Sequence, residues 1–316
     1  MKRLLASEES VRQAAEAIQE GKLVIVPTET VYGIAADALN PDAIDLLFQA
    51  KERPSENPLI VHIGSMQQIS FLSSSWNRLA QTLADAFWPG PLTLVVEKSD
   101  TVPNRVTGGQ DTVALRMPSS WEVMALCRLS ETPLAIPSAN RFMQLSPTSA
   151  DHIDPKLASF AEVLIDGGSC AVGVESTVVD CTSDSPVILR PGAIPRYKIY
   201  AAVGLEEDLD VAAGIPSHRS PGQYPRHYAP KTPIELVDHL EDHQPGLVFA
   251  SPMNPDQLQM PNEAEAYAVR LYAALFDMDL RELQKVFVEM PPDHPDWEAV
   301  RDRLLKASAP YEAASG

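Results

Sequence analysis

The sequence predicts an α/β protein in two parts, and three observations support this prediction. Short apolar segments alternate with helical patterns over roughly the first 190 residues, which indicates a largely buried, mixed sheet covered by helices. A proline-rich stretch then interrupts the alternation, and a shorter alternation follows it. A chain of 316 residues, 45% of them hydrophobic, is also long enough to bury more than one core.

The first elements carry clear start and stop signals. A helix is predicted over residues 7–20, because Ser7 can cap it, apolar residues recur at helical spacing, and Gly21 can end it. A strand over residues 22–26 follows. Asn40 and Pro41 then mark the start of a second helix, which is expected to end near Lys51.

The remaining elements of the first part follow from apolar runs and helical spacing. Strands are predicted at 58–63, 92–97, 112–118, 133–140, 161–166, 176–180 and 186–190, and helices at 75–87 and 122–129. The texture changes afterwards, because residues 215–233 hold five prolines and show no helical or strand period. We therefore predict a catalytic domain over 1–198, a linker or active-site lid over 199–230, and a smaller α/β domain over 231–316.

Charge and cysteine content restrict the class of protein. The net charge of −18 argues against a broad basic surface for nucleic acid or an anionic membrane. Residues 231–316 contain 16 acidic and 7 basic residues, so the smaller part carries −9 of that charge. Three cysteines without a CxxC spacing make a disulfide framework or a zinc ribbon improbable and fit a reducing cytoplasm. We expect no signal peptide and no membrane span.

Polar side chains follow several predicted strands, where connecting loops meet in open α/β folds. They are Thr28 to Tyr32, Lys51 to Asn57, His62, Arg116, Ser138, Asn140, Glu175 to Thr177, and Arg190. Each has an ordinary reading: the threonines can belong to a turn, the basic residues can lie at a solvated helix end, and His62 can be a buried core histidine. Arg116 is more informative, because a guanidinium in an apolar run needs an anion or solvent.

Several familiar catalytic motifs are missing. The sequence has no GxxxxGK[ST] loop, no GxGxxG, no GxSxG and no HExxH. His239 and His243 stand four residues apart, but acidic neighbours make a metal site there a minor alternative, and we predict no protein metal site. Any nucleotide chemistry must therefore use another cradle.

Nine segments in order resemble one family. They are PTETVYGIAAD, AKERPSENPLIVHI, FWPGPLTLVV, VALRMP, IPSAN, SPT, GVESTVVD, LRPG and HYAPK. Together they are similar to YrdC-like threonylcarbamoyl-adenylate synthases of the longer, two-domain SUA type, and the similarity covers essentially the whole chain. The resemblance implies a twisted mixed sheet around a concave pocket, joined by the proline-rich linker to a C-terminal α/β domain.

The family implies a reaction and a set of partners. L-Threonine, bicarbonate or CO2, and ATP would give L-threonylcarbamoyl-AMP and pyrophosphate, with Mg²⁺ sharing the phosphate charge. The product would pass to a transfer machinery that modifies adenosine in certain tRNAs, so tRNA would be contacted only indirectly or weakly. The expected location is the cytoplasm.

The resemblance also assigns residues to roles. It places Thr30, His62, Arg116 and Ser176 at threonine, with Arg116 clamping the carboxylate. It places Arg53, Asn57, Thr112, Ser138, Ser146, Arg190 and Tyr224 at ATP. Lys51, Arg53, Ser138 and Asn140 match the family's Lys-x-Arg and Ser-x-Asn signature and are expected to be catalytic, through charge stabilisation. His62 can accept the amine proton or position the substrate by hydrogen bonding, and both roles stay open.

Two departures from the family pattern affect single positions. Phe142 and Met143 stand where a small Ser-Gly pair is common, which bears on Ser146, and the linker GQYPRHY differs locally, which bears on Tyr224. Two alternative functions are a nucleotide- or RNA-binding module without turnover and a carbamoyl-phosphate-using adenylate enzyme. An RNA-binding module would need clustered basic residues, which this acidic chain lacks. A carbamoyl-phosphate-using enzyme would bring acylphosphatase and zinc-finger-like segments, which this chain does not have.

Overall fold

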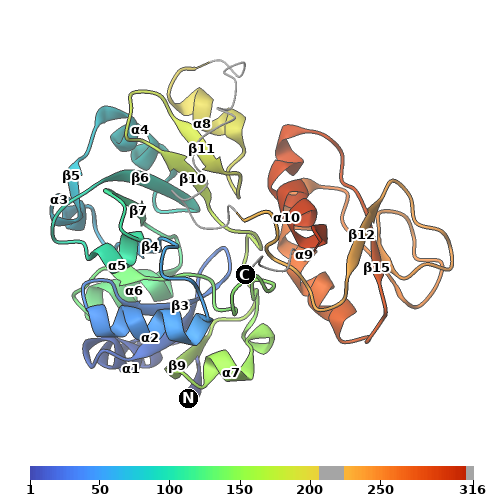
Figure 1. Ribbon diagram of the computed structural model, residues 1–316, viewed down its shortest axis with the longest axis horizontal. Coiled ribbons are helices and arrows are strands. Elements are labelled where there is room, and N and C mark those ends of the chain that lie inside the picture. The colour runs from blue at the N-terminus through green and yellow to red at the C-terminus, as the bar shows by residue number, and fades with distance from the viewer. Residues whose placement is uncertain (206–223, 311–316) are drawn as a thin grey trace, which may run out of the picture.

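The computed structural model describes residues 1–205 and 224–310, which form two α/β domains (Figure 1). The larger domain is built on an 11-stranded mixed sheet and the smaller domain on a four-stranded parallel sheet. The α/β prediction and the division into a large and a small sheet are thereby confirmed. Within the described residues, no helix is long and apolar enough to span a membrane.

The larger sheet has the order β1-β9-β2-β3-β8-β4-β7-β6-β10-β11, with β5 paired to β6. Its strands are β1 Lys2–Leu5, β2 Leu23–Pro27, β3 Tyr32–Asp37, β4 Ile60–His62, β5 Ser73–Ser75, β6 Leu92–Lys98, β7 Thr112–Arg116, β8 Leu134–Ala135, β9 Ala161–Asp166, β10 Thr177–Asp180 and β11 Val187–Arg190. Its helices are α1 Glu8–Gln19, α2 Pro41–Lys51, α3 Ile69–Leu72, α4 Arg78–Phe87, α5 Asn104–Thr107, α6 Trp121–Leu129, α7 Pro155–Ala158 and α8 Arg196–Ala202.

The predicted helix starts are formed by side-chain caps. The Ser7 hydroxyl accepts a hydrogen bond from the backbone N–H of Ser10, and the Ser10 hydroxyl accepts one from the backbone N–H of Ser7. Both backbone N–H groups at the start of α1 therefore have an acceptor. Asn40 Oδ1 accepts from the amides of Asp42 and Ala43 at the start of α2. These caps fix the directions in which α1 and α2 leave the sheet.

The structure differs from the sequence prediction in several elements. Residues 32–37 form strand β3, antiparallel to β2, where the sequence indicated only a polar loop. The helix predicted over 75–87 begins at Arg78, because Asn77 caps it and Ser75 pairs in β5. The strand predicted at 133–140 is reduced to two residues, Leu134–Ala135, so the following residues are free to line the pocket described below.

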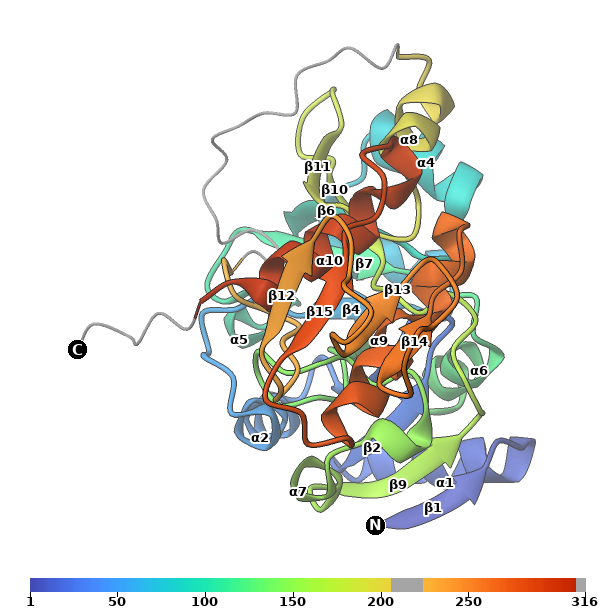
Figure 2. The ribbon, with the colours of Figure 1, turned by 90° about the vertical axis from the view of Figure 1, so that its right-hand side faces the viewer.

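The smaller domain lies beside the larger one, with its helices facing the seam (Figures 1 and 2). Its strands are β12 Ile234–Val237, β13 Gly246–Val248, β14 Gln257–Gln259 and β15 Val286–Glu289, in the order β12-β15-β13-β14. Its helices are α9 Ala264–Asp279 and α10 Glu298–Ser308. Three short 3-10 turns, Met66–Gln68, Ala150–His152 and Pro295–Trp297, complete the described elements.

Helix α8 crosses the domain boundary predicted at residue 198. Ile199 is fully buried in the core of the larger domain, so this helix belongs to the larger domain. Residues 206–223 of the predicted linker lie outside the described residues. The next described segment begins at Tyr224 and contacts both domains.

Candidate functional site

A small pocket opens where β3, β4, β7, β10 and β11 come together, and most of the predicted site residues meet there. The pocket has a volume of about 50 Å³. Its walls contain Thr30, Arg53, His62, Arg116, Ser138, Ser176 and Arg190, together with Glu175, His227 and Tyr228. Polar groups that are far apart in the sequence therefore converge in one hollow.

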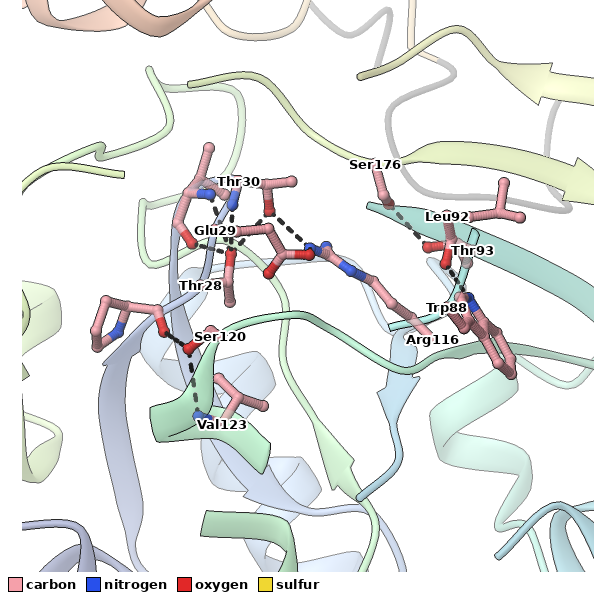
Figure 3. Close-up of polar contacts among 12 residues, drawn as sticks. Thr28, Glu29, Thr30, Trp88, Leu92, Thr93, Arg116, Ser120, Val123 and Ser176 are labelled. Atoms are coloured by element: carbon pink, nitrogen blue, oxygen red, sulfur yellow. Dashed lines mark hydrogen bonds and ion pairs between the residues drawn. The ribbon is translucent and has the colours of Figure 1, made fainter. Parts of the chain in front are cut away.

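Arg116 forms one end of the pocket, at the last residue of β7. Its Nη2 donates to Glu29 Oε1 at 2.6 Å and to Thr30 Oγ1 at 3.1 Å (Figure 3). Arg116 and Glu29 are both buried, with side chains 5% and 9% exposed. Arg116 Nε and Glu29 Oε2 have no partner among the described residues. A buried ion pair in which each partner has one unused hydrogen-bonding atom is suited to a small zwitterionic ligand.

The turn that carries Thr30 is held by Thr28. Thr28 Oγ1 accepts from the amides of Thr30 and Val31, both at 3.1 Å, and donates to the Val31 carbonyl at 2.7 Å (Figure 3). This local closure keeps the loop between β2 and β3 compact and directs Glu29 and Thr30 toward Arg116. Thr28 is thus part of the loop's framework.

His62 lies next to Arg116, because β4 and β7 pair in parallel with these two residues in register. Both of its ring nitrogens are buried without a partner among the described residues. Burial, and after it the positive charge of Arg116, holds the pKa of His62 well below its ordinary value. The ring is therefore neutral at pH 7 and can both donate and accept a hydrogen bond.

Ser176 and Arg190 form the opposite wall. Arg190 donates through Nε and Nη2 to the Ser176 carbonyl, at 3.2 and 2.9 Å, and through Nη2 to Ser176 Oγ at 3.1 Å. Ser176 Oγ also lies 2.8 Å from Thr93 Oγ1 (Figure 3). The side chain predicted at ATP and the side chain predicted at threonine are thus one hydrogen-bonded unit.

Arg53 and Ser138 line the second half of the pocket. Arg53 donates to the Pro58 carbonyl at 3.0 Å, while its Nε has no partner among the described residues. Burial lowers the pKa of Arg53 to about 10, so it remains charged at pH 7. A half-buried cation with no acidic partner among the described residues favours an anionic ligand on this side.

Tyr224 and the residues after it cover this half. Tyr224 Oη donates to Asn57 Oδ1 at 2.6 Å, and its ring packs edge-on against Phe142 with centroids 5.2 Å apart. His227 and Tyr228 are buried in the pocket wall. Phe142, a departure from the family pattern, is therefore the surface on which the covering segment rests.

Lys51 and Asn140 lie behind the pocket wall. Lys51 Nζ donates to the carbonyls of Ser138 and Asn140, the latter at 2.6 Å. Asn140 Nδ2 donates to the carbonyls of Arg141 and Gln144. Both side chains contact the loop that presents Ser138 and neither lines the pocket, and their expected catalytic role stays a prediction.

Two further predicted residues lie outside the pocket lining. Thr112 is the first residue of β7 and Arg116 the last, so Thr112 lies at the opposite end of the strand. Ser146 is fully buried and donates to Glu175 Oε1 at 2.6 Å. Ser146 therefore acts on the pocket through Glu175.

Glu29 and Glu175 are site residues that the sequence analysis did not assign. Both stand inside quoted segments, PTETVYG and GVESTVVD, next to a residue that was assigned. An acidic residue in a loop is normally solvated, and nothing local distinguishes these two. Their significance comes from burial against Arg116 and Arg303, which only the folded chain brings near.

No group of three or more His, Cys, Asp or Glu in the described parts of the chain could hold a metal ion. Larger hollows exist, among them one of about 480 Å³ between residues 191–197 and helix α9 and one of about 590 Å³ beside Arg196 and Glu298. The small pocket differs from them because it gathers seven of the predicted site residues, so we take it as the candidate functional site.

Comparisons with known proteins agree with this geometry. The family model Sua5_yciO_yrdC, described as "Telomere recombination", matches residues 16–192, and the model "Threonylcarbamoyl-AMP synthase, C-terminal domain" matches residues 194–309. The chain is 39% identical to the threonylcarbamoyl-AMP synthase of Pyrococcus abyssi, over 95% of this chain and 94% of that protein. The chain belongs to the threonylcarbamoyl-AMP synthase family.

Other relatives extend the match over the whole chain. The threonylcarbamoyl-AMP synthase of Bacillus subtilis is 37% identical, over 96% of this chain and 94% of that protein. The crystal structure of P. abyssi Sua5 complexed with L-threonine superposes with a TM-score of 0.88 at 38% identity, over 97% of this chain and 96% of that one. The family and the two-domain organisation expected from the nine segments are thus confirmed.

Proposed function

We propose that this protein makes L-threonylcarbamoyl-AMP and pyrophosphate from L-threonine, bicarbonate or CO2, and ATP. Its place in the threonylcarbamoyl-AMP synthase family supports this activity, as does the L-threonine held by its P. abyssi relative. The product serves the formation of threonylcarbamoyladenosine in tRNA, which makes the enzyme a nucleotidyltransferase.

One observation supports the amino-acid half most directly: polar atoms without a partner among the described residues gather at one end of the small pocket. They are Arg116 Nε and the two ring nitrogens of His62, both residues of the pocket lining, and Oε2 of Glu29, the ion-pair partner of Arg116. Buried polar groups are nearly always hydrogen-bonded, so this set calls for a ligand with both donors and acceptors. L-Threonine supplies a carboxylate for Arg116, an amine for Glu29 or His62, and a hydroxyl for Thr30, His62 or Ser176.

The same residues account for the first chemical step. Threonine's amine must lose a proton before its nitrogen attacks CO2 and forms the carbamate. Ionised Glu29 can hold the ammonium form, and neutral His62, a weak base because its pKa is well below its ordinary value, can orient the amine by a hydrogen bond while the proton leaves to solvent or bicarbonate. Enclosure in a water-poor pocket protects the carbamate while it waits for the nucleotide.

Arg53, Ser138 and Arg190 carry the second step. A carbamate oxygen attacks the α-phosphorus of ATP in line, and pyrophosphate leaves. The two guanidinium groups stabilise the charge spread over the phosphoryl oxygens, and Lys51 and Asn140 hold Ser138 in place. The magnesium ion enters as part of the Mg–ATP substrate, because Mg²⁺ is commonly bound through substrate phosphates with few protein ligands.

The covering segment works as a lid over the nucleotide half. The present pocket of about 50 Å³ is far below the ~300–1,000 Å³ of typical ligand sites, so ATP needs the segment from Tyr224 onward to move outward. Asn57, which the resemblance assigns to ATP, is occupied by Tyr224 Oη in this closed arrangement. Release of this bond would free Asn57 for the nucleotide, and reclosure would exclude water.

The remaining assignments concern the product's route. The mixed anhydride is handed to a separate transfer machinery in the cytoplasm, and tRNA is met indirectly or weakly, in keeping with the net charge of −18. A binding module without turnover is the alternative function, and it differs in making no pyrophosphate.

Pyrophosphate release, combined with mass spectrometry of the product, tests the proposal. We expect release to require threonine and bicarbonate together, and we expect the product to have the mass of threonylcarbamoyl-AMP. ATP turnover without threonine, or no turnover with full ATP binding, would contradict the proposal. Serine as a competing substrate measures selectivity, because one methyl group is worth only ~1–3 kcal/mol.

A further inference from the structure

A buried arginine of the smaller domain reaches into the wall of the active-site pocket. Arg303, on α10, has a side chain only 1% exposed. Its Nε donates to Glu175 Oε2 at 2.7 Å, its Nη1 donates to the Pro191 carbonyl at 3.0 Å, and its guanidinium lies 4.8 Å from the centre of the Tyr228 ring. Glu175 and Tyr228 line the pocket, and Pro191 directly follows Arg190, which lines it as well.

Glu175 is the centre of this connection. Its carboxylate accepts a hydrogen bond from Arg303 and another from Tyr272 of α9, whose Oη lies 3.1 and 3.2 Å from the two carboxylate oxygens. Both donors belong to the smaller domain. From the larger domain it accepts from Ser146 Oγ at 2.6 Å. The next residue, Ser176, is the one that Arg190 holds through two hydrogen bonds to its carbonyl. The position of this wall therefore depends on two residues of the smaller domain.

A second ion pair across the same seam lacks these connections. Arg196, in α8, pairs with Glu298, in α10, and these side chains are 32% and 23% exposed. Neither residue lines the pocket. A partly solvated pair of this kind already links the domains, whereas a fully buried pair is a poor source of net stability. Docking alone thus does not explain why Arg303 is buried against Glu175.

We propose that Arg303 is a positioning residue of the active site, which sets Glu175, and through it Ser146, Ser176 and Arg190, for the transfer step. The smaller domain then completes the catalytic site, with α10 as the element that does so. This inference rests on the proposed synthase function. It assigns to Arg303 no contact with substrate, since its partners are Glu175, Pro191, Tyr228 and its neighbour Asp302.

The test compares variants of the two cross-domain pairs in the full-length protein. We expect Arg303→Met to lower kcat by about 100-fold, because small displacements at a transfer site have effects of this size. The KM for threonine should rise by less than about tenfold, since Ser176 is displaced but Arg116 and His62 keep their places. Arg303→Lys should recover about tenfold of the loss, because it retains the charge. Arg196→Met, the matched control, should stay within about twofold of the wild type.

A double-variant cycle separates positioning from general damage. Glu175→Gln with Arg303→Met removes both charges, so no buried charge is left unpaired and the protein should fold. If Arg303 acts through Glu175, Arg303→Met should add less than about threefold in the Glu175→Gln background. Multiplicative losses in the cycle, or equal losses in Arg303→Met and Arg196→Met, would overturn the inference.

A second measurement does not depend on turnover. Amide hydrogen exchange at residues 175–177 and 192–194 should rise in Arg303→Met and stay at the wild-type rate in Arg196→Met. Unchanged exchange in both variants would overturn the positioning role even if the wild type proved inactive. A wild type that makes no threonylcarbamoyl-AMP, with exchange altered only in Arg303→Met, would instead reject the proposed function and retain the structural coupling.

Discussion

At the scale of single residues, two of the acidic side chains at the site are buried and already paired with arginines of the protein. Arg116 is paired with Glu29 and Glu175 with Arg303. Removing one partner of such a pair leaves a buried charge, which costs far more than the pair contributes. Substitutions to alanine at these positions therefore mix loss of function with loss of stability, and substitutions that keep size or charge are more informative.

Arg116→Lys is such a substitution for the amino-acid half. Lysine keeps the positive charge beside Glu29 but loses the planar fork that can hold a carboxylate with two bonds. We expect the KM for threonine to rise by about 10–100-fold, because this factor corresponds to the binding free energy of one hydrogen bond to a charged group. The KM for ATP should stay nearly unchanged. Steady-state kinetics with each substrate varied in turn measures this, and an equal rise in both KM values would contradict it.

For Arg190→Ala, the structure leads to a different expectation from the family pattern alone. The sequence comparison placed Arg190 at ATP and left threonine to other residues. Because Arg190 holds the carbonyl and the hydroxyl of Ser176, we expect its removal to weaken the use of both substrates. The two substrates' KM values, measured beside those of Arg116→Lys, decide between the two expectations.

The pH dependence of stability provides a test of Glu175. Burial would raise its pKa, but the charges of Arg303 and Arg190 and the bond from Ser146 outweigh this and lower the pKa to about 2, against an ordinary 4.5. Because the pKa of Glu175 is lower in the folded state than in the unfolded state, its ionised carboxylate stabilises the folded protein fully above pH 4.5. This stabilisation is lost as the pH falls toward 2. The loss amounts to about 3 kcal/mol.

Urea unfolding between pH 3 and pH 7 measures this contribution. The difference in unfolding free energy between the wild type and Glu175→Gln should be largest at pH 5–7 and shrink steadily below pH 4.5. Glu298→Gln, in the partly exposed pair, is the control and should show a much smaller difference. A constant difference across the range would mean that Glu175 does not titrate as inferred.

At the scale of elements, two pieces of secondary structure place the pocket's second half. Helix α2 ends at Lys51, and strand β8 stops after two residues, so Lys51 reaches the carbonyls of the loop 138–140. Burial, and after it the charge of Arg53, lowers the pKa of Lys51 well below its ordinary value. Lys51 is the hydrogen-bond donor to this loop.

Lys51→Met separates support of the loop from stability. Methionine fills the same space, removes the cost of burying an amine, and leaves two carbonyls without a donor. We expect the unfolding free energy to change by less than about 2 kcal/mol and the rate of product formation to fall at least tenfold. The control is Lys156→Met, an exposed lysine paired with Glu52. Full activity in Lys51→Met would contradict a role in presenting Ser138.

At the scale of the whole molecule, the loop 171–174 joins the two domains to the amino-acid half of the site. Gly173 donates its amide to the Thr30 carbonyl at 3.1 Å and Val172 donates to the Glu29 carbonyl at 2.8 Å. On its other side, Gly173 touches α9: a Cβ there would lie 2.3 Å from Val269 Cα. The close contact of this loop with the smaller domain thus requires glycine.

Gly173→Ala should separate the domains. Its φ of +81° is unfavourable for alanine by ~1–2 kcal/mol, and the new methyl group would also meet the backbone of α9. Gly168, with φ of +79° and open space around it, is a matched control for the backbone cost alone. We expect both variants to lose stability, but only Gly173→Ala to increase the radius of gyration in solution scattering and to lose activity. Equal behaviour of the two would exclude this contact as the docking point.

The sequence by itself determined the family, the α/β class and seven of the residues that line the pocket. Start and stop signals such as Ser7, Asn40 and Gly21 act locally, so α1 and α2 could be predicted almost to the residue. Strand β3 was missed because its residues, YGIAAD, include a glycine, two alanines and an acid, and antiparallel pairing with β2 overrides their weak preference. The segment motifs identified Arg116, His62, Ser176 and Arg190 because their order along the chain is itself specific.

Only the tertiary structure decided how these residues work together. Glu29, Glu175 and Arg303 became visible because burial makes an unpaired charge costly, and burial depends on which distant segments meet. Glu175 and Arg303 are separated by 128 residues, and no local pattern links them. The participation of the smaller domain in the pocket is for the same reason a property of the fold, set by how α10 packs against the catalytic sheet.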